Sequence, residues 1–207
     1  MDWNQITIKK YDEIMDIIQE GLDSLEMNIA LINCIFGIKA EDIPIAKLTY
    51  YINELSFLKN PPVGKKPKSQ YKVGDKLFNV TLDVSKITTA QYIDFQTLIK
   101  TKDVKRLLAV LFVPDGTNYG DTDESDFLYD NLTIDVYTDV MFFFANLWKK
   151  LMLHILRSSK KMIKMKLKTE KNKQKRIPIL RNLVKLEQMR LLVNDNELFG
   201  LTELVKH

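Results

Sequence analysis

The sequence holds very few of the residues on which disulfide scaffolds, metal sites and thiol chemistry depend. Its 207 residues include one cysteine, Cys34, and two histidines, His154 and His207. A single cysteine excludes an intramolecular disulfide and favours a reducing compartment. Because Cys34 lies in the apolar stretch NIALINCIF, we expect a buried, unreactive thiol. His154 has no Cys, Asp or Glu three or four residues away, so no metal site is predicted.

Glycine, proline and long apolar stretches are also scarce. The seven glycines and six prolines are few for the many tight turns of an all-β sandwich or barrel, which favours a mainly helical fold. The stretch VMFFFANLW is followed at once by Lys149 and Lys150, well short of the roughly 20 apolar residues of a membrane span. The N-terminal MDWNQITIKKYDE lacks a signal-peptide pattern. We therefore expect a soluble protein made in the cytosol, without membrane contact.

Motifs for phosphate binding and catalysis are missing as well. Neither GxxxxGK[ST] nor GxGxxG occurs, and no serine nucleophile elbow is present. Asp121, Asp123 and Ser125 have the spacing of a calcium loop, but its glycine position holds Asp126 and its glutamate position holds Leu132. Among 27 acidic residues, nothing in the sequence selects a catalytic pair. We predict no catalytic residue, no metal, no cofactor and no small-molecule substrate.

Apolar spacing predicts helices along most of the chain. A first helix is expected from Tyr11 to Leu25, and a second from Ile29 to Phe36 that ends at Gly37. Pro44 fits the start of a third helix, which continues to Leu58. Three more are expected: one opened by the capping-box spacing of Thr88 and Gln91, one starting near Asp103, and a long one from about Ile134. Pro178 is expected to open the last helix.

One β-hairpin is predicted, because apolar and polar residues alternate as they do in a strand with one buried face. In QYKVGDKLFNVTLDV, Gly74 and Asp75 separate two extended pieces, and apolar and polar residues alternate after them. LLAVLFV, residues 107–113, fits either a buried helix or a strand, and PDGTNYGDTDESD is expected to be an acidic surface loop. The predicted class is mainly α (α+β). A core domain spans 1–153 with a hairpin around 70–84, and a basic helical extension spans 154–207.

Charge is divided unevenly along the chain. Residues 1–148 carry 15 Lys/Arg and 22 Asp/Glu, whereas residues 149–190 carry 15 Lys/Arg and two acids. The segment RSSKKMIKMKLKTEKNKQKR, residues 157–176, holds ten basic side chains and one acid, Glu170. Like charges at helical spacing destabilise an isolated helix, so we expect an external anionic surface to complete this segment.

Two sets of residues are therefore candidates for partner contacts. The first is predicted to bind a partner protein or nucleic acid: Arg157, Lys160, Lys161, Lys164, Lys166, Lys168, Lys171, Lys173, Lys175 and Arg176. The second is predicted to form an acidic subunit interface: Asp115, Asp121, Asp123, Glu124 and Asp126. Phosphate contact and an acidic protein partner both remain open for the basic set. No aromatic residue between Trp148 and Phe199 could stack on a base.

Several segments resemble virion proteins of tailed bacteriophages. DWNQITIKKYDEI, YKVGDKLFNVTLDVSKITTAQYIDFQTLIK, LLAVLFVPDGTNYGD and DVMFFFANLWKKLM are similar to proteins of the neck and tail module in crAss-like phages of Bacteroides. The resemblance covers about residues 3–153 and does not extend to the basic segment. It implies a ring-forming component between portal and tail, or a tail-assembly factor, present in many copies and without enzymatic activity.

These observations lead to one expected function and two alternatives. We expect a non-enzymatic structural component of the virion that forms a homo-oligomeric ring in the portal-to-tail region. Its predicted partners are the portal or other neck and tail proteins, with non-specific contact to DNA. The alternatives are a cytoplasmic tail-assembly chaperone and a nucleic-acid-binding accessory protein.

Overall fold

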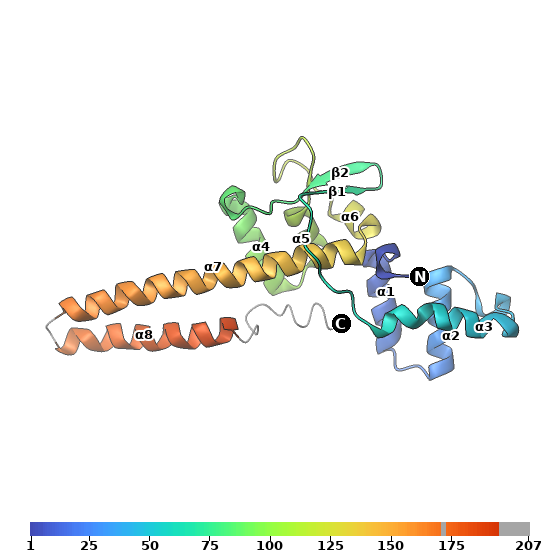
Figure 1. Ribbon diagram of the computed structural model, residues 1–207, viewed down its shortest axis with the longest axis horizontal. Helices are drawn as coiled ribbons and strands as arrows, with labels where there is room; N and C mark the ends of the chain where they lie inside the picture. The colour runs from blue at the N-terminus through green and yellow to red at the C-terminus, as the bar shows by residue number, and fades with distance from the viewer. Residues whose placement is uncertain (171–172, 195–207) are drawn as a thin grey trace. The chain divides into compact units, whose positions relative to one another are not determined.

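The fold is mainly helical with one small antiparallel sheet, which confirms the predicted class. A computed structural model describes residues 1–170 and 173–194 (Figure 1). Its helices are α1 (Ile8–Gln19), α2 (Ser24–Phe36), α3 (Ile45–Glu54), α4 (Thr89–Thr101), α5 (Val104–Leu111), α6 (Ser125–Asn131), α7 (Ile134–Thr169) and α8 (Lys173–Asn194). Its strands are β1 (Gln70–Val73), β2 (Lys76–Asn79) and β3 (Val113–Pro114).

The chain divides into two compact units. The first is Met1–Met141, and the second begins at Phe142, inside α7. The predicted boundary between residues 153 and 154 lies further along the same helix. Both positions lie within one continuous helix, because α7 contains no glycine or proline.

Capping side chains and glycines set the ends of the N-terminal helices. The Thr7 hydroxyl accepts a hydrogen bond from the Lys10 amide at the start of α1. The helix predicted to reach Leu25 instead stops at Gln19, because Gly21 adopts a φ of 70° and the Asp23 carboxylate caps a new helix. As predicted, α2 ends at Gly37, which adopts the left-handed conformation that a C-terminal cap requires.

The predicted hairpin is present and gains a third strand. β1 and β2 pair antiparallel, with Tyr71 opposite Phe78 and a turn at Gly74 and Asp75. β3 pairs with β2 at Phe78 and Asn79, which divides the ambiguous run 107–113 between helix α5 and this strand. Gly74 has a φ of 59°, and a Cβ there would lie 3.2 Å from the Phe127 ring. The positive φ therefore favours glycine at this turn, and a Cβ would also require the Phe127 ring to shift by a few tenths of an ångström.

Two predicted helix starts are confirmed, and one short helix was missed. Thr88 and Gln91 form the expected capping box at α4, and the Asp103 carboxylate accepts from the Arg106 amide to cap α5. The acidic segment predicted as a loop, residues 114–126, ends in the first two residues of α6, a seven-residue helix that was not predicted. Pro178 lies inside α8 instead of opening it. Because proline has no backbone N–H, α8 lacks one of its backbone hydrogen bonds at this position.

A short β-bridge joins the N-terminal segment to the start of α7. The Ile8 amide donates to the Leu132 carbonyl at 3.0 Å, and the Ile134 amide donates to the Ile6 carbonyl at 2.8 Å. Thr7 and Thr133 form the bridge between these two bonds. All four isoleucine and leucine side chains are buried, so the bridge lies within the core of the first unit.

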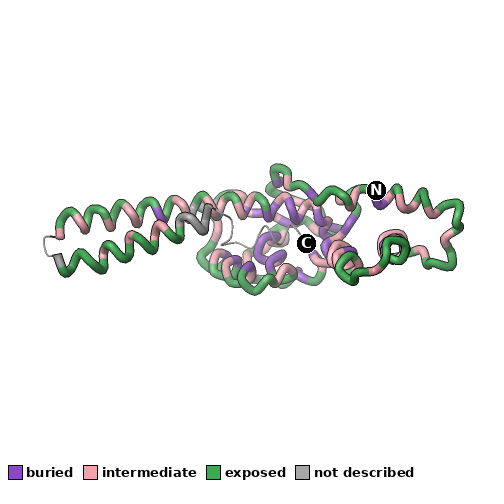
Figure 2. Tube along the Cα trace, turned by 90° about the horizontal axis from the view of Figure 1, so that it is seen from below, coloured by how far each residue is buried: buried purple, intermediate pink, exposed green. Residues whose placement is uncertain are grey.

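The core of the first unit gathers side chains from distant parts of the sequence. Phe78, Phe112 and Leu128 are completely buried, and so are Ile14 of α1 and Val140 of α7. Figure 2 shows buried residues on the segments of this unit, whereas the described side chains of the later part of α7 and of α8 are mainly exposed or intermediate. The first unit thus has a core of its own.

Replacing Ile14 with alanine tests whether α1 is held by this core. The side chain is completely buried, so the Ile14→Ala variant should lose about 2–5 kcal/mol of unfolding free energy through lost contacts and a cavity. Urea denaturation followed by circular dichroism measures the loss. Ile18, one turn later on α1 and 41% exposed, is the matched control, and Ile18→Ala should cost roughly 1 kcal/mol or less. Equal losses in the two variants would contradict the packing described.

Candidate partner-binding hairpin

The later part of α7 and α8 form an antiparallel helical hairpin. The two helices run side by side in both views (Figures 1 and 2), and Lys160 of α7 pairs with Glu187 of α8. Leu156 is buried, and further apolar side chains at helical spacing are half-buried. These half-buried side chains are Ile163 and Leu167 on α7 with Ile179, Leu183 and Leu186 on α8. They form the seam of the hairpin.

One face of α7 is basic along three turns. Arg157, Lys161, Lys164 and Lys168, which we name the basic row, follow one another at steps of four, three and four residues, and all are exposed. At 3.6 residues per turn, these steps place the four side chains on one face of the helix. Lys150 and His154 precede them at the same spacing and are also exposed. The charge therefore forms a stripe and does not surround the helix evenly.

The other residues of the predicted basic set lie elsewhere. Lys160 is in the seam and paired with Glu187, while Lys166 is exposed on another face of α7. Lys175 and Arg176 are exposed in the first turns of α8. Lys171 lies outside the described residues, as does the side chain of Lys173. The structure thus brings four of the ten predicted residues into one row.

The basic row has no acidic partner within the described part of the chain. None of its four side chains forms an ion pair with a carboxylate in residues 1–170 and 173–194. Like charges four residues apart on a helix cost about 0.2–0.5 kcal/mol per pair. The row therefore carries a small energetic cost that an anionic surface would remove.

The hairpin also exposes aliphatic side chains that sequence reasoning did not separate from its core. On α7, Ile155, Met162 and Met165 are 44%, 55% and 52% exposed. On α8, Ile177, Leu180 and Val184 are 52%, 47% and 58% exposed. We name these the α7 apolar row and the α8 apolar row. The sequence signal was present, because Met162 and Met165 lie off the spacing that joins Leu156, Ile163 and Leu167.

The predicted acidic set is engaged within its own chain. Asp115 accepts a hydrogen bond from the side-chain amide of Asn79 at 2.8 Å, and Glu124 forms an ion pair with Lys76 at 2.7 Å. Asp126 pairs with Lys105. Asp121 and Asp123 each accept a backbone amide, at 2.9 Å from Asn118 and 3.0 Å from Ser125 respectively. These five carboxylates stabilise loops and helix starts, and their role at a subunit interface stays a prediction.

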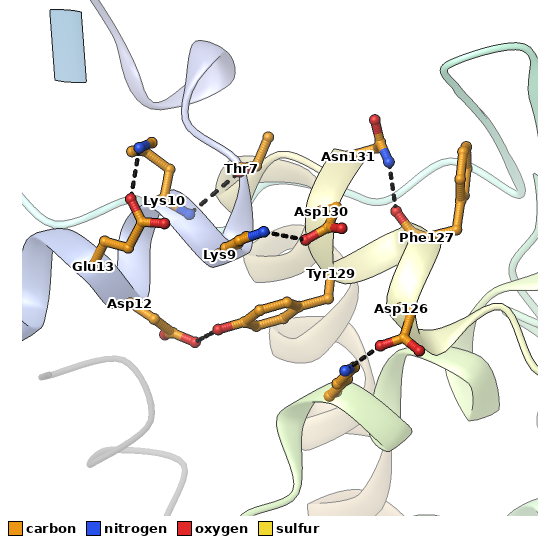
Figure 3. A network of polar contacts seen from close by, with 11 residues as sticks. Thr7, Lys9, Lys10, Asp12, Glu13, Asp126, Phe127, Tyr129, Asp130 and Asn131 are labelled. Carbon is orange, nitrogen blue, oxygen red and sulfur yellow. Dashed lines mark hydrogen bonds and ion pairs between the residues drawn. The ribbon is translucent and has the colours of Figure 1, made fainter. Parts of the chain in front are cut away.

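A polar network of the first unit joins α1 to α6 (Figure 3). Lys9 pairs with Asp130 at 3.0 Å, and the Tyr129 hydroxyl donates to Asp12 at 2.5 Å. Burial raises the pKa of Asp12 above its ordinary value, and the hydrogen bond from Tyr129 opposes that rise. Burial and the bond to Asp12 raise the pKa of Tyr129, so the phenol keeps its proton. The network joins the two helices and places no nucleophile beside an accessible base.

Cys34 is half-buried, whereas the sequence predicted a buried thiol. Its Sγ lies 3.7 Å from Glu13 Oε2, and Glu13 also binds Lys10 at 2.6 Å. Burial raises the pKa of the Cys34 thiol, which lowers the fraction of thiolate at neutral pH. In the described residues no group of three potential ligands could hold a metal ion. None of the helices in residues 1–170 and 173–194 is long and apolar enough to cross a membrane.

Comparisons of the chain with protein-family models, with curated proteins and with solved structures found no match.

The hydrogen bond between Tyr129 and Asp12 should contribute more at neutral pH than in acid. Because the pKa of Asp12 is raised in the folded protein, its ionised form opposes folding above that pKa. Tyr129→Phe removes the donor that relieves this cost, so the variant should lose about 1–2 kcal/mol at pH ~7. The loss should shrink as the pH falls through the folded-state pKa of Asp12.

Urea denaturation at several pH values measures this difference. Tyr50, which is 60% exposed, is the matched control, and Tyr50→Phe should change the free energy of unfolding little at any pH. A loss in Tyr129→Phe that did not depend on pH would contradict the role assigned to the hydrogen bond.

The ion pair between Lys160 and Glu187 should couple the two helices of the hairpin. Lys160→Glu and Glu187→Lys should each destabilise the hairpin by like-charge repulsion, and the double exchange should recover the loss. The expected coupling is about 0.5–1 kcal/mol, since both side chains are about one-third exposed. Chemical denaturation followed by helical circular dichroism measures it. Lys161 is the control, because combining Lys161→Glu with Glu187→Lys should bring no such recovery.

Proposed function

We propose that this protein is a non-enzymatic structural component of a tailed-phage virion that oligomerises in the portal-to-tail region. The observation that carries the proposal is the basic row, an exposed stripe of four cationic side chains without an acidic partner in the described residues. A solvated helix normally mixes both signs of charge, whereas this face presents one sign. The resemblance of residues 3–153 to neck and tail proteins supports a location in the portal-to-tail region of the virion.

The chemistry of the described residues supports a binding role over catalysis. The one cysteine has a raised pKa, and the acidic residues predicted at an interface hold loops and helix starts. The α7–α8 hairpin offers both exposed cations and exposed apolar side chains to a partner. A positive stripe guides association and orients a negatively charged partner, and in this role it contributes more to rate and register than to affinity.

A second candidate function, a tail-assembly chaperone, is favoured by the exposed aliphatic side chains of the hairpin. The α7 and α8 apolar rows place six large apolar side chains in solvent, each 44–58% exposed. Such surfaces are typical of protein–protein contacts. If this protein is a chaperone, a tail protein would cover these two rows only until the particle is complete. If it is a structural subunit, its neighbours in the virion would cover them permanently.

Mass photometry at low salt tests the first proposal. The purified protein should form a ring or another defined oligomer, alone or with a portal or tail protein. Exchanging Lys161, Lys164 and Lys168 for glutamate should weaken the assembly, and the same exchange at exposed Lys39, Lys47 and Lys59 should not. A protein that stays monomeric at high concentration and binds no neck or tail protein would refute the proposal.

Proteomics of purified particles separates the two functions. A structural component is retained in the finished virion in many copies. A chaperone is abundant in infected cells and absent from the particle. A gel shift with duplex DNA tests the nucleic-acid alternative, in which affinity should collapse between low and moderate salt.

A further inference from the structure

The later part of α7 has three distinct faces. If Leu156 of the seam is set at 0°, each residue adds 100° around the helix. The basic row then centres about 110° from the seam in one rotational sense, and the α7 apolar row about 130° away in the other. One face packs against α8, the second is cationic and the third is aliphatic.

α8 repeats this division, with its charged and apolar faces reversed in position. Its seam residues are Ile179, Leu183 and Leu186, and its apolar row lies about 130° from them in the sense that leads to the basic row on α7. Exposed Arg181 and Lys185 lie on the opposite side of α8. Because the helices are antiparallel and face each other through their seams, rows displaced in the same sense fall on the same side of the hairpin. The basic row and the α8 apolar row therefore share one side.

The ion pair at Lys160 and Glu187 sets the heights of these two rows. Val184 precedes Glu187 by three residues, which places it level with Ile163 and beside Lys164. Leu180 lies one further turn along, beside Lys168. One side of the hairpin thus offers a strip of aliphatic side chains next to a strip of cations over the same two turns.

We propose that this side of the hairpin binds an amphipathic helix of another protein, which carries an apolar stripe bordered by acidic residues. Such a helix would lie along the two rows and complete a three-helix bundle, with its apolar stripe on Ile177, Leu180 and Val184 and its acids on the basic row. The match rests on charge complementarity and on apolar side chains that are about half exposed. The inference rests on the proposed function, whose partner it describes chemically.

Other occupants fit these two rows less well. Duplex DNA would use the cations and leave the aliphatic strip without a partner. A single strand would find no aromatic residue between Trp148 and Phe199 on which its bases could stack. A bilayer would reach only one of the two apolar rows, because they lie on opposite sides of the hairpin. A second hairpin of this chain would bring like charges together, since residues 149–190 hold only two acids. An acidic extended strand would find no free sheet edge on a pair of helices.

Fluorescence anisotropy with two labelled peptides tests the inference on the full chain. The probe is a helical peptide of about 20 residues, with leucines along one face and glutamates along one border. The matched peptide carries glutamine at every glutamate. The protein should bind the glutamate peptide about tenfold or more tightly than the glutamine peptide.

Substitutions on each strip decide what kind of site it is. K161E/K164E/K168E and L180S/V184S should each weaken binding of the glutamate peptide about tenfold or more, because both strips contribute. R181E/K185E, on the opposite side of the hairpin, is the control and should change binding little. Circular dichroism should show unchanged helix content in all three variants, and Leu180→Ala alone provides a milder substitute if L180S/V184S loses helix content.

Two outcomes would overturn the inference. Binding that depends on the lysines and is unaffected at Leu180 and Val184, with duplex DNA bound equally well, would indicate a general polyanion site. Failure of the glutamate peptide to bind would also refute it. If that failure occurs while the protein still assembles with neck or tail proteins, the proposed function stands and only the partner's chemistry is wrong.

Discussion

The two hydrogen bonds between residues 6–8 and residues 132–134 are the constraint on which the first unit depends. They join segments more than 120 residues apart in the sequence, and they do so where Ile6, Ile8, Leu132 and Ile134 are buried. Water cannot replace such bonds without exposing the side chains around them. α1 starts immediately after one strand of this bridge and α7 starts at the end of the other, so the bridge fixes where both helices leave the core.

Much of the secondary structure could be predicted because its signals are local. Thr88 with Gln91, Gly37 after an apolar run, and Gly74 between alternating residues each place a cap or a turn through the chemistry of neighbouring residues. The failures have tertiary causes. The two residues of β3 become a strand only because β2 offers an open edge, and the 6–8 to 132–134 bridge depends on pairing over a distance that no periodicity records.

The candidate site was predicted in part, and the reason is geometric. Counting charges along residues 157–176 locates a basic segment, but the charges are useful to a partner only where they fall on one face. Lys160 illustrates the difference, because its neighbour Lys161 is exposed on the surface while Lys160 pairs with Glu187 within the hairpin. The density of acidic residues at 115–126 predicted a subunit interface; their side chains bind groups of their own chain, and the interface stays a prediction.

The three-faced form of α7 limits how the length of this helix can change. Inserting a single residue between Lys160 and Met162 would turn the rest of α7 by about 100° relative to Leu156, so that Lys166 would take a place in the seam. A gain or loss of seven residues shifts the faces by only about 20°, which side chains can absorb. Hairpins of this design should therefore lengthen or shorten in whole heptads, so that reach can vary while the chemistry of each face is retained.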